Sequence, residues 1–150
     1  MNEKCQRIKY QRMMNKLLWS PLPYPEGRFK GKGIVVCAGG ERYFPCAWVC
    51  LKLLRHLGCH LPIELWYRGR SEMNSQMIEL VTSMGVECID AYEVAKKNPV
   101  RQLNGWELKP YAIINSSFED VLSIDADNVP ARNPEFLLSS PEYEETGAIF

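Results

Sequence analysis

The chain has 150 residues, of which 46% are hydrophobic, and its 18 basic residues balance its 18 acidic residues to a formal net charge of zero. A chain of this length can bury about 68 to 70% of the surface that it exposes when unfolded, so it can form a core without disulfides or a structural metal. The balanced charge leaves no overall positive field that would attract nucleic acid, and we expect no nucleic acid among its partners.

Residues 1–32 have the composition of an N-terminal arm and a proline-rich linker. A basic, helix-compatible stretch is followed by Pro21, Pro23, Pro25 and Gly27, which neither continue a helix nor enter a central strand. The sequence contains no run of about 20 apolar residues and no signal-peptide pattern, so we expect no membrane segment. Taken as it stands, the sequence predicts a cytoplasmic protein.

The first predicted strand comes directly after the linker. Residues 34–38 form a continuous apolar run, typical of a strand buried on both faces, and Gly39 and Gly40 end it. Pro45 stands where a helix can begin, and apolar residues then recur at helical spacing up to Gly58, which can cap the helix end. The pattern predicts a strand followed by a helix.

The alternation of strands and helices continues along the chain. Short apolar runs predict three further strands, at residues 63–67, 86–89 and 121–124. Apolar residues at helical spacing predict two further helices, one from a cap at Ser71 to Met84 and one at residues 106–117. This order predicts an α/β fold in which helices flank a mostly parallel, Rossmann-like sheet.

The last three residues, Ala148 to Phe150, have the pattern of the opening of another strand. We therefore expect the chain to be part of a longer protein, truncated at its C-terminus.

The cysteines do not have the spacing of a metal or redox centre. There are six, and no pair has the C-x-x-C spacing of a zinc site or a dithiol. Four of them lie within apolar patterns, at Cys37, Cys46, Cys50 and Cys88, and we expect these to be buried reduced thiols.

The strongest functional signal is a pair of carboxylates at the end of the last predicted strand. Asp125 and Asp127 are two residues apart, and alternate residues of a strand share a face. Two such charges about 4 Å apart would repel by about 4 kcal/mol at an effective dielectric constant of 20, and a divalent cation removes this conflict. The pair therefore predicts a Mn²⁺ (or Mg²⁺) site that binds a diphosphate. The alternative is that both residues only stabilise a turn leading to Pro130.

A nucleotide-binding segment is expected where the first strand ends. Gly39 and Gly40 allow the backbone to approach a nucleotide closely, and Arg42 beside them is a candidate for an anion contact. Lys109 could reach phosphate oxygens near the metal, although a solvated surface lysine is an equal alternative. The G-x-G-x-x-G fingerprint is absent, which disfavours a nicotinamide dehydrogenase. Trp106 could stack on a base or sugar.

Several segments of the chain have the pattern of a known family. Five of them are residues 33–40, 53–55, 61–66, 106–110 and 116–130, and residues 133–136 and 145–150 are also similar. Together they resemble the fungal-type α-mannosyltransferases, which have the nucleotide-sugar GT-A fold. The resemblance covers most of residues 33–150 and implies that this region is the nucleotide-sugar-binding part of a GT-A domain.

The resemblance also implies an activity. A member of this family would transfer mannose from GDP-mannose to a hydroxyl of a glycan or glycoprotein acceptor, with Mn²⁺ between the aspartates and the diphosphate. Asp125 would face the ribose and the metal, Asp127 would ligate the metal, and Ala38, Gly39 and Lys109 would lie at the donor. Family members usually have a membrane anchor and a longer C-terminal half, which would imply the Golgi lumen. No catalytic residue is assigned.

Two other functions remain open from the sequence. The D-x-D-x-V pattern after a strand also resembles the haloacid-dehalogenase-type phosphatases, in which Asp125 would be the nucleophile. That fold needs a lysine and further acids well downstream, and only 23 residues follow Asp127. The third alternative is a non-catalytic remnant that binds a nucleotide sugar.

Overall fold

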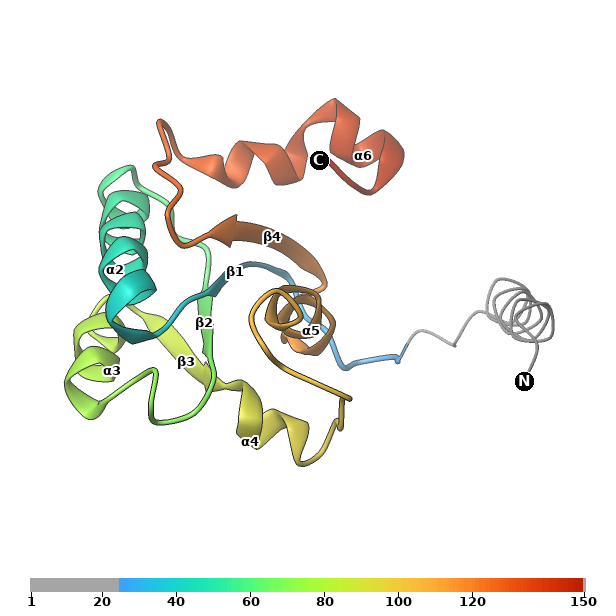
Figure 1. Ribbon diagram of the computed structural model, residues 1–150. Helices are drawn as coiled ribbons and strands as arrows, with labels where there is room; N and C mark the ends of the chain where they lie inside the picture. Colours follow the sequence, from blue (N-terminus) through green and yellow to red (C-terminus); the bar gives the residue numbers. More distant parts are fainter. Residues whose placement is uncertain (1–24, 150) are drawn as a thin grey trace, which may run out of the picture.

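The computed structural model describes residues 25–149, and its centre is a sheet of four parallel strands (Figure 1). Their order across the sheet is β3-β2-β1-β4. The strands are β1 (Lys32–Cys37), β2 (Ile63–Tyr67), β3 (Val86–Asp90) and β4 (Asp120–Asp125). All three strand pairs are parallel, which confirms the predicted α/β fold.

Helices cover both faces of this sheet (Figure 1). One face carries α2 (Gly40–His56) and α3 (Ser75–Thr82), and the other carries α4 (Ala91–Ala95) and α5 (Leu108–Asn115). After β4 the chain forms a short 3-10 helix, η1 (Pro134–Ser139), and then α6 (Pro141–Thr146). Helices on both faces of a parallel sheet are the arrangement of nucleotide-binding α/β folds, including GT-A.

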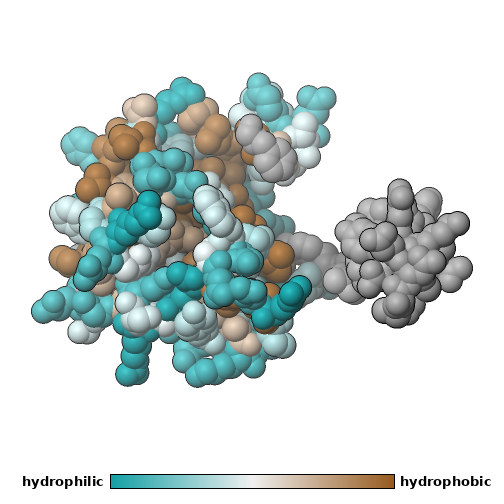
Figure 2. Space-filling model, viewed as in Figure 1, coloured by the Kyte–Doolittle hydropathy of each residue, from teal (hydrophilic) through white to brown (hydrophobic). Residues whose placement is uncertain are grey.

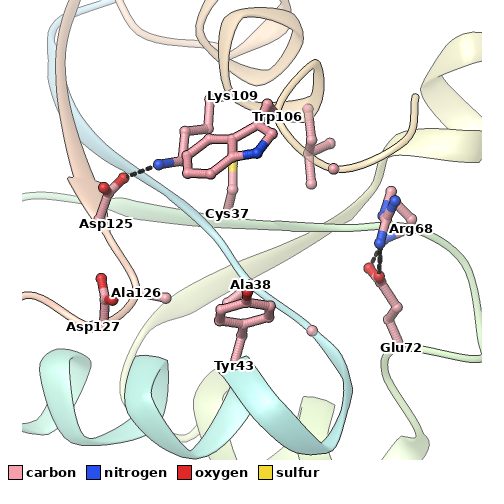
Figure 3. A pocket seen from close by; sticks show the side chains of 13 residues that line it. Cys37, Ala38, Tyr43, Arg68, Glu72, Trp106, Lys109, Asp125, Ala126 and Asp127 are labelled. Carbon is pink, nitrogen blue, oxygen red and sulfur yellow. Dashed lines mark hydrogen bonds and ion pairs between the residues drawn. The ribbon is translucent and has the colours of Figure 1, made fainter. Parts of the chain in front are cut away.

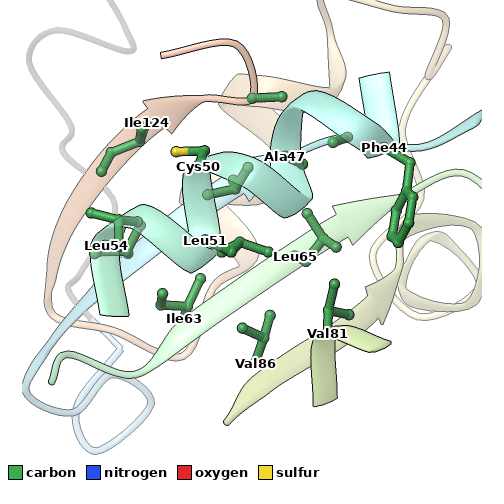
Figure 4. Close-up of a cluster of buried hydrophobic side chains, with 14 of the residues drawn as sticks. Phe44, Ala47, Cys50, Leu51, Leu54, Ile63, Leu65, Val81, Val86 and Ile124 are labelled. Carbon is green, nitrogen blue, oxygen red and sulfur yellow. The ribbon is translucent and has the colours of Figure 1, made fainter. Parts of the chain in front are cut away.

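The larger part of the core lies between the sheet and α2 and α3 (Figure 4). Every strand contributes to it, and the alternating side chains of β1 and β4 supply Ile34, Val36 and Ile124. From α2 the buried stripe consists of Phe44, Ala47, Cys50, Leu51 and Leu54. Burial of these side chains holds α2 against the sheet and so fixes its first turn at the end of β1.

The opposite face of the sheet has a smaller core with more aromatic side chains. Trp66 of β2 is buried and meets Tyr111 of α5 edge to face, with ring centroids 6.3 Å apart. Such a pair contributes about 0.5 to 1.5 kcal/mol beyond its buried area. The buried carboxylate of Glu64 accepts hydrogen bonds from Trp66 Nε1 at 2.8 Å and from the backbone and hydroxyl of Ser117. These contacts fix α5 next to β1 and β2.

The four strands agree with the sequence prediction to within two residues at each end, but the helix boundaries differ. The helix α2 begins at Gly40 and contains Pro45, which was predicted to start it. The helix α3 begins after Asn74, whose side chain accepts the Met77 N–H, and not after Ser71. A cap is decided by which side chain reaches the free N–H groups, and several polar residues in this loop were candidates.

Other elements were not expected from the sequence. The helices α4, η1 and α6 are five or six residues long, too short for a helical period to be visible. The helix α5 is also shorter than the predicted 106–117. No strand forms at Ala148 and Ile149, and Phe150 lies outside the described residues.

One of the four cysteines predicted to be buried is exposed. Cys50 is buried, and Cys37 and Cys88 are partly buried, but Cys46 is exposed. Cys46 lies one residue before Ala47, about 100° around the helix from the stripe that packs on the sheet. The pattern around it is apolar only because exposed apolar residues of α2, such as Val49, adjoin the stripe. On the face shown in Figure 2, such apolar side chains gather over α2 at the left.

The predicted arm lies mostly outside the described residues. Of residues 1–32, the structure describes 25–32, in which the Arg28 guanidinium donates to the Ile114 carbonyl oxygen and Lys32 begins β1. Within residues 25–149, the helices are all too short or too polar to span a bilayer.

Candidate functional site

A cavity of about 280 Å³ opens at the carboxyl ends of β1 and β4. The two strands are neighbours in the sheet, but the chain leaves β1 through α2 toward β2, on the side away from β4. Parallel α/β sheets bind ligands at such a point. The cavity is lined by Cys37, Ala38, Gly39, Tyr43, Arg68, Glu72, Gly105, Trp106, Leu108, Lys109, Asp125, Ala126 and Asp127 (Figure 3).

The two aspartates stand at one end of this cavity (Figure 3). Ile124 and Ala126 are buried in the core, so the alternating Asp125 and Asp127 are exposed toward the cavity. The strand ends at Asp125, and the Asn128 N–H donates to the Asp125 carbonyl oxygen at 3.0 Å to close a turn. Both carboxylates therefore line one wall of the cavity.

Lys109 lies next to these carboxylates. It is the second residue of α5, and its Nζ is 2.5 Å from Oδ1 of Asp125. The same ammonium lies 4.8 Å from the centre of the Trp106 ring, a cation–π contact of about 0.5 to 1 kcal/mol at an exposed position. Lys109 thus balances the charge of Asp125, and Asp127 has no ion pair among the described residues.

A second charged pair stands at the other end of the cavity (Figure 3). Arg68 follows β2, and its Nε and backbone N–H donate to the two carboxylate oxygens of Glu72 at 3.0 and 2.8 Å. The hydrogen bond that it donates to Glu72 raises the pKa of the Arg68 guanidinium. A further guanidinium N–H points to the Leu103 carbonyl oxygen at 3.4 Å. The pair forms a rigid wall that retains free N–H donors.

Two exposed aromatic rings lie between these charged ends, on opposite sides of the cavity (Figure 3). Tyr43 comes from the first turn of α2 and is 48% exposed, and Trp106 precedes α5 and is 82% exposed. Large aromatic rings are buried when packing alone decides their position. Their exposure at a cavity provides two flat apolar surfaces for a planar ligand.

The glycines at the end of β1 have different surroundings. Gly39 is extended, with φ −177°, and a Cβ atom there would lie 2.6 Å from Cβ of Glu72. Gly40 has φ +70° and open space around it, and its N–H donates to the Glu72 carbonyl oxygen at 2.7 Å. The close contact at this turn is thus between Gly39 and Glu72, and the approach of these glycines to a nucleotide stays a prediction.

The structure brings most of the predicted donor residues together. Ala38, Gly39, Lys109, Asp125 and Asp127 all line the cavity. The lining does not include Gly40 or Arg42, so their contact with a nucleotide stays a prediction. The Arg42 guanidinium lies 5.2 Å from the centre of the Tyr43 ring.

The cavity lining also contains residues that were not predicted from the sequence to bind the donor. Among them are Tyr43, Arg68 and Glu72. The four-residue spacing of Arg68 and Glu72 was a usable signal, because it is the spacing of many local ion pairs.

Cys37 lies beside Lys109 in the cavity lining. Burial raises the pKa of its thiol to about 12, although the Lys109 ammonium opposes the rise. The thiol is therefore neutral near pH 7 and adds no charge to the site.

The carboxylate oxygens at the cavity suit a hard cation that also binds water or phosphate oxygens. No group of three or more His, Cys, Asp or Glu side chains with metal-binding geometry occurs among residues 25–149. Asp125 and Asp127 could supply two carboxylates, and phosphate oxygens and water would complete the shell of Mg²⁺ or Mn²⁺. The two carboxylates therefore fit such an ion, and a bound phosphate would add further oxygen ligands.

Comparison with known proteins identifies the family. A family model described as "Mannosyltransferase putative" matches residues 31–150, a span that contains the whole cavity. The chain belongs to this mannosyltransferase family. The match confirms the resemblance to fungal-type α-mannosyltransferases.

Three curated relatives in the family are similar to this chain. It is 34% identical over 139 residues to alpha-1,2-mannosyltransferase MNN21 of Candida albicans, covering 86% of this chain and 21% of the relative. It is 28% identical over 128 residues to alpha-1,2-mannosyltransferase MNN2 of Saccharomyces cerevisiae, covering 83% and 21%. It is 32% identical over 115 residues to MNN24 of Candida albicans, covering 76% and 16%. The chain spans about a fifth of the length of these mannosyltransferases.

Proposed function

We propose that residues 33–150 form the donor-binding part of a metal-dependent glycosyltransferase that transfers mannose from GDP-mannose to a glycan hydroxyl. The observation that carries this proposal is the cavity in which Asp125, Asp127 and Lys109 meet at the end of β4. Membership of the mannosyltransferase family supports mannose as the sugar.

The cavity offers a place for each part of a nucleotide sugar. The base would lie between the rings of Tyr43 and Trp106, with the free N–H groups of Arg68 near its edge. Gly39 would let the backbone approach the ribose, because it has no side chain. The diphosphate would lie at the other end, where Lys109 supplies a positive charge.

The carboxylates would hold the cation of this site. Asp125 and Asp127 would ligate Mn²⁺ (or Mg²⁺) through hard oxygen donors. Such an ion would stabilise the negative charge that develops on the departing diphosphate. Lys109 would contribute to the same stabilisation from the start of α5, since its ammonium already lies at this wall.

The acceptor side of the reaction is proposed from the family alone. The curated relatives carry the name alpha-1,2-mannosyltransferase, which supports an α-1,2 linkage to a glycan or glycoprotein. The resemblance implies the Golgi lumen as the site of the reaction.

Nucleotide binding tests the donor site directly. We expect calorimetric titration to show that GDP binds about tenfold more tightly with Mn²⁺ than with a chelator, and more tightly than UDP. Replacing both aspartates, by Asp125→Asn and Asp127→Asn, should abolish the metal effect without unfolding the domain. The matched control is Glu87→Gln, an exposed carboxylate on β3 outside the cavity. A GDP affinity unchanged by chelation would exclude the metal role.

Turnover distinguishes the remaining functions. Labelled GDP-mannose and an aryl phosphate should be offered to the intact protein side by side. Transfer of mannose, or release of GDP from the donor, supports the proposal. Donor binding with neither reaction indicates a non-catalytic nucleotide-sugar-binding protein. Phosphate release from the aryl ester would indicate the phosphatase chemistry in which Asp125 is a nucleophile.

A further inference from the structure

Among the described residues, Lys109 and Asp125 form the one ion pair at the cavity wall that carries Asp125 and Asp127. The Lys109 side chain is 33% exposed and its ammonium has two contacts, with Oδ1 of Asp125 and with the face of Trp106. Asp127 has no ion pair there. The ammonium of Lys109 therefore lies against Asp125, one of the two proposed metal ligands, and not against Asp127.

This position conflicts with a cation on Asp125. A divalent ion on either oxygen of that carboxylate would lie within about 4 to 5 Å of the ammonium, and like charges at this distance repel strongly. The thiol of Cys37 is neutral and does not reduce the repulsion. Binding of a metal by both aspartates therefore favours a Lys109 side chain that has moved away from Asp125.

A bound nucleoside diphosphate would provide alternative hydrogen-bond acceptors for the Lys109 ammonium. Its phosphate oxygens would lie beside the same wall and accept the ammonium, and a lysine side chain needs only rotamer changes to reach them. We propose that Lys109 is a displaceable counter-cation, which pairs with Asp125 in the free protein and with the diphosphate in the complex. This inference rests on the proposed function and adds to it the coupling between metal and nucleotide.

Loss of the Lys109 ammonium should change the affinities for Mn²⁺ and for GDP in opposite directions. Removing the ammonium should strengthen binding of Mn²⁺ alone, because Asp125 becomes free. It should weaken binding of GDP in the presence of a chelator, because the diphosphate loses a positive contact. A lysine that only supported the fold would weaken both, so the pair of measurements separates the two roles.

The experiment compares the whole chain with Lys109→Met, Lys109→Arg and Lys52→Met. Lys109→Arg keeps the charge, and Lys52→Met removes an exposed lysine that also lies over a tryptophan ring, 5.5 Å from the centre of Trp48. Binding of Mn²⁺ is followed by the loss of the electron paramagnetic resonance signal of the free ion, with and without saturating GDP. GDP binding is measured by calorimetry in chelator. Because GDP itself chelates Mn²⁺, the coupling is compared between variants.

We expect Lys109→Met to bind Mn²⁺ alone about tenfold more tightly than the wild type, to bind GDP about tenfold more weakly in chelator, and to show weaker coupling than the wild type. Lys52→Met should resemble the wild type, and Lys109→Arg, which keeps the positive charge beside Asp125, should bind Mn²⁺ alone no more tightly than the wild type. Equal Mn²⁺ affinity and equal coupling in Lys109→Met and wild type would overturn the role of Lys109 and leave the proposed function standing. Absence of Mn²⁺ binding in every variant, even with GDP, would overturn both.

Discussion

The backbone of Gly39 packs against Glu72 so closely that a Cβ atom at Gly39 would lie only 2.6 Å from Cβ of Glu72. Glu72 cannot yield easily, since its carboxylate is bound by Arg68 and its carbonyl oxygen by the Gly40 N–H. This contact holds the end of β1 against the wall of the cavity that carries Arg68.

Gly39→Ala should therefore displace this wall. We expect a loss of about 1 to 3 kcal/mol in the free energy of unfolding, as for other overpacked positions, together with weaker GDP binding. Urea denaturation and calorimetry measure the two effects. Gly85→Ala, outside the cavity, is the matched control: it has room for the methyl group, and φ +70° costs stability alone, about 1 to 2 kcal/mol. GDP binding to Gly39→Ala that equals binding to Gly85→Ala would contradict this role of Gly39.

Trp106→Ala should separate binding from stability. The side chain is 82% exposed, so its removal should change the free energy of unfolding by no more than about 1 kcal/mol, the contribution of its cation–π contact with Lys109. We expect GDP affinity to fall about tenfold, because base–aromatic stacking contributes about 1 to 3 kcal/mol. Ile114→Ala, an exposed apolar residue on α5 outside the cavity, is the control. Equal GDP affinity in both variants would remove Trp106 from the base site.

The pair formed by Arg68 and Glu72 should show a coupling energy. Both side chains are less than a third exposed, so removing one partner leaves the other partly buried and unpaired. We expect Arg68→Met and Glu72→Gln each to lower the free energy of unfolding by about 1 to 2 kcal/mol, and the double variant to lose less than the sum. A double-mutant cycle measured in urea checks this. Additive losses would mean that the pair does not stabilise the wall.

Glu135 predicts a dependence of stability on acid pH. Its Oε1 accepts the His60 N–H at 2.6 Å and the Leu61 N–H at 3.3 Å, and the first of these hydrogen bonds is the main cause of its lowered pKa. A carboxyl group with a lowered pKa stabilises the folded state above its unfolded pKa, and this contribution is lost as the pH falls through the folded value.

Glu135→Gln should consequently be less stable than the wild type at pH 7, by about 1 kcal/mol, and the difference should shrink as the pH is lowered below the unfolded pKa of the carboxyl group. Urea denaturation at a series of pH values measures it. Glu142→Gln, on α6, reports the effect of removing one exposed negative charge. If the stability difference between Glu135→Gln and the wild type stays constant with pH, the ionised carboxylate of Glu135 does not stabilise the contact between η1 and the loop before β2.

The strands could be predicted because each is a short buried run. Residues 34–38 and 63–67 are apolar at nearly every position, and the structure places β1 and β2 there, between helices on both faces. The buried Glu64 did not disturb the pattern, since one polar residue in a strand is tolerated when its carboxylate is fully hydrogen-bonded.

Helix ends were predicted less well, because they depend on single contacts. The start of α2 at Gly40 follows from the hydrogen bond between its N–H and Glu72, 32 positions further along the chain. Asn74 caps α3 through one side-chain oxygen, in a loop where Ser71 was an equal candidate by residue type.

The sequence by itself determined the α/β class, the mannosyltransferase family and the carboxylate pair, because these depend on residues that are neighbours in the chain. Only the tertiary structure decided which residues join Asp125 and Asp127. Lys109, Trp106, Tyr43 and Arg68 come from different elements and meet there because β1 lies between β2 and β4. That strand order results from burying both faces of the sheet under helices, a requirement of the whole core that no local pattern expresses.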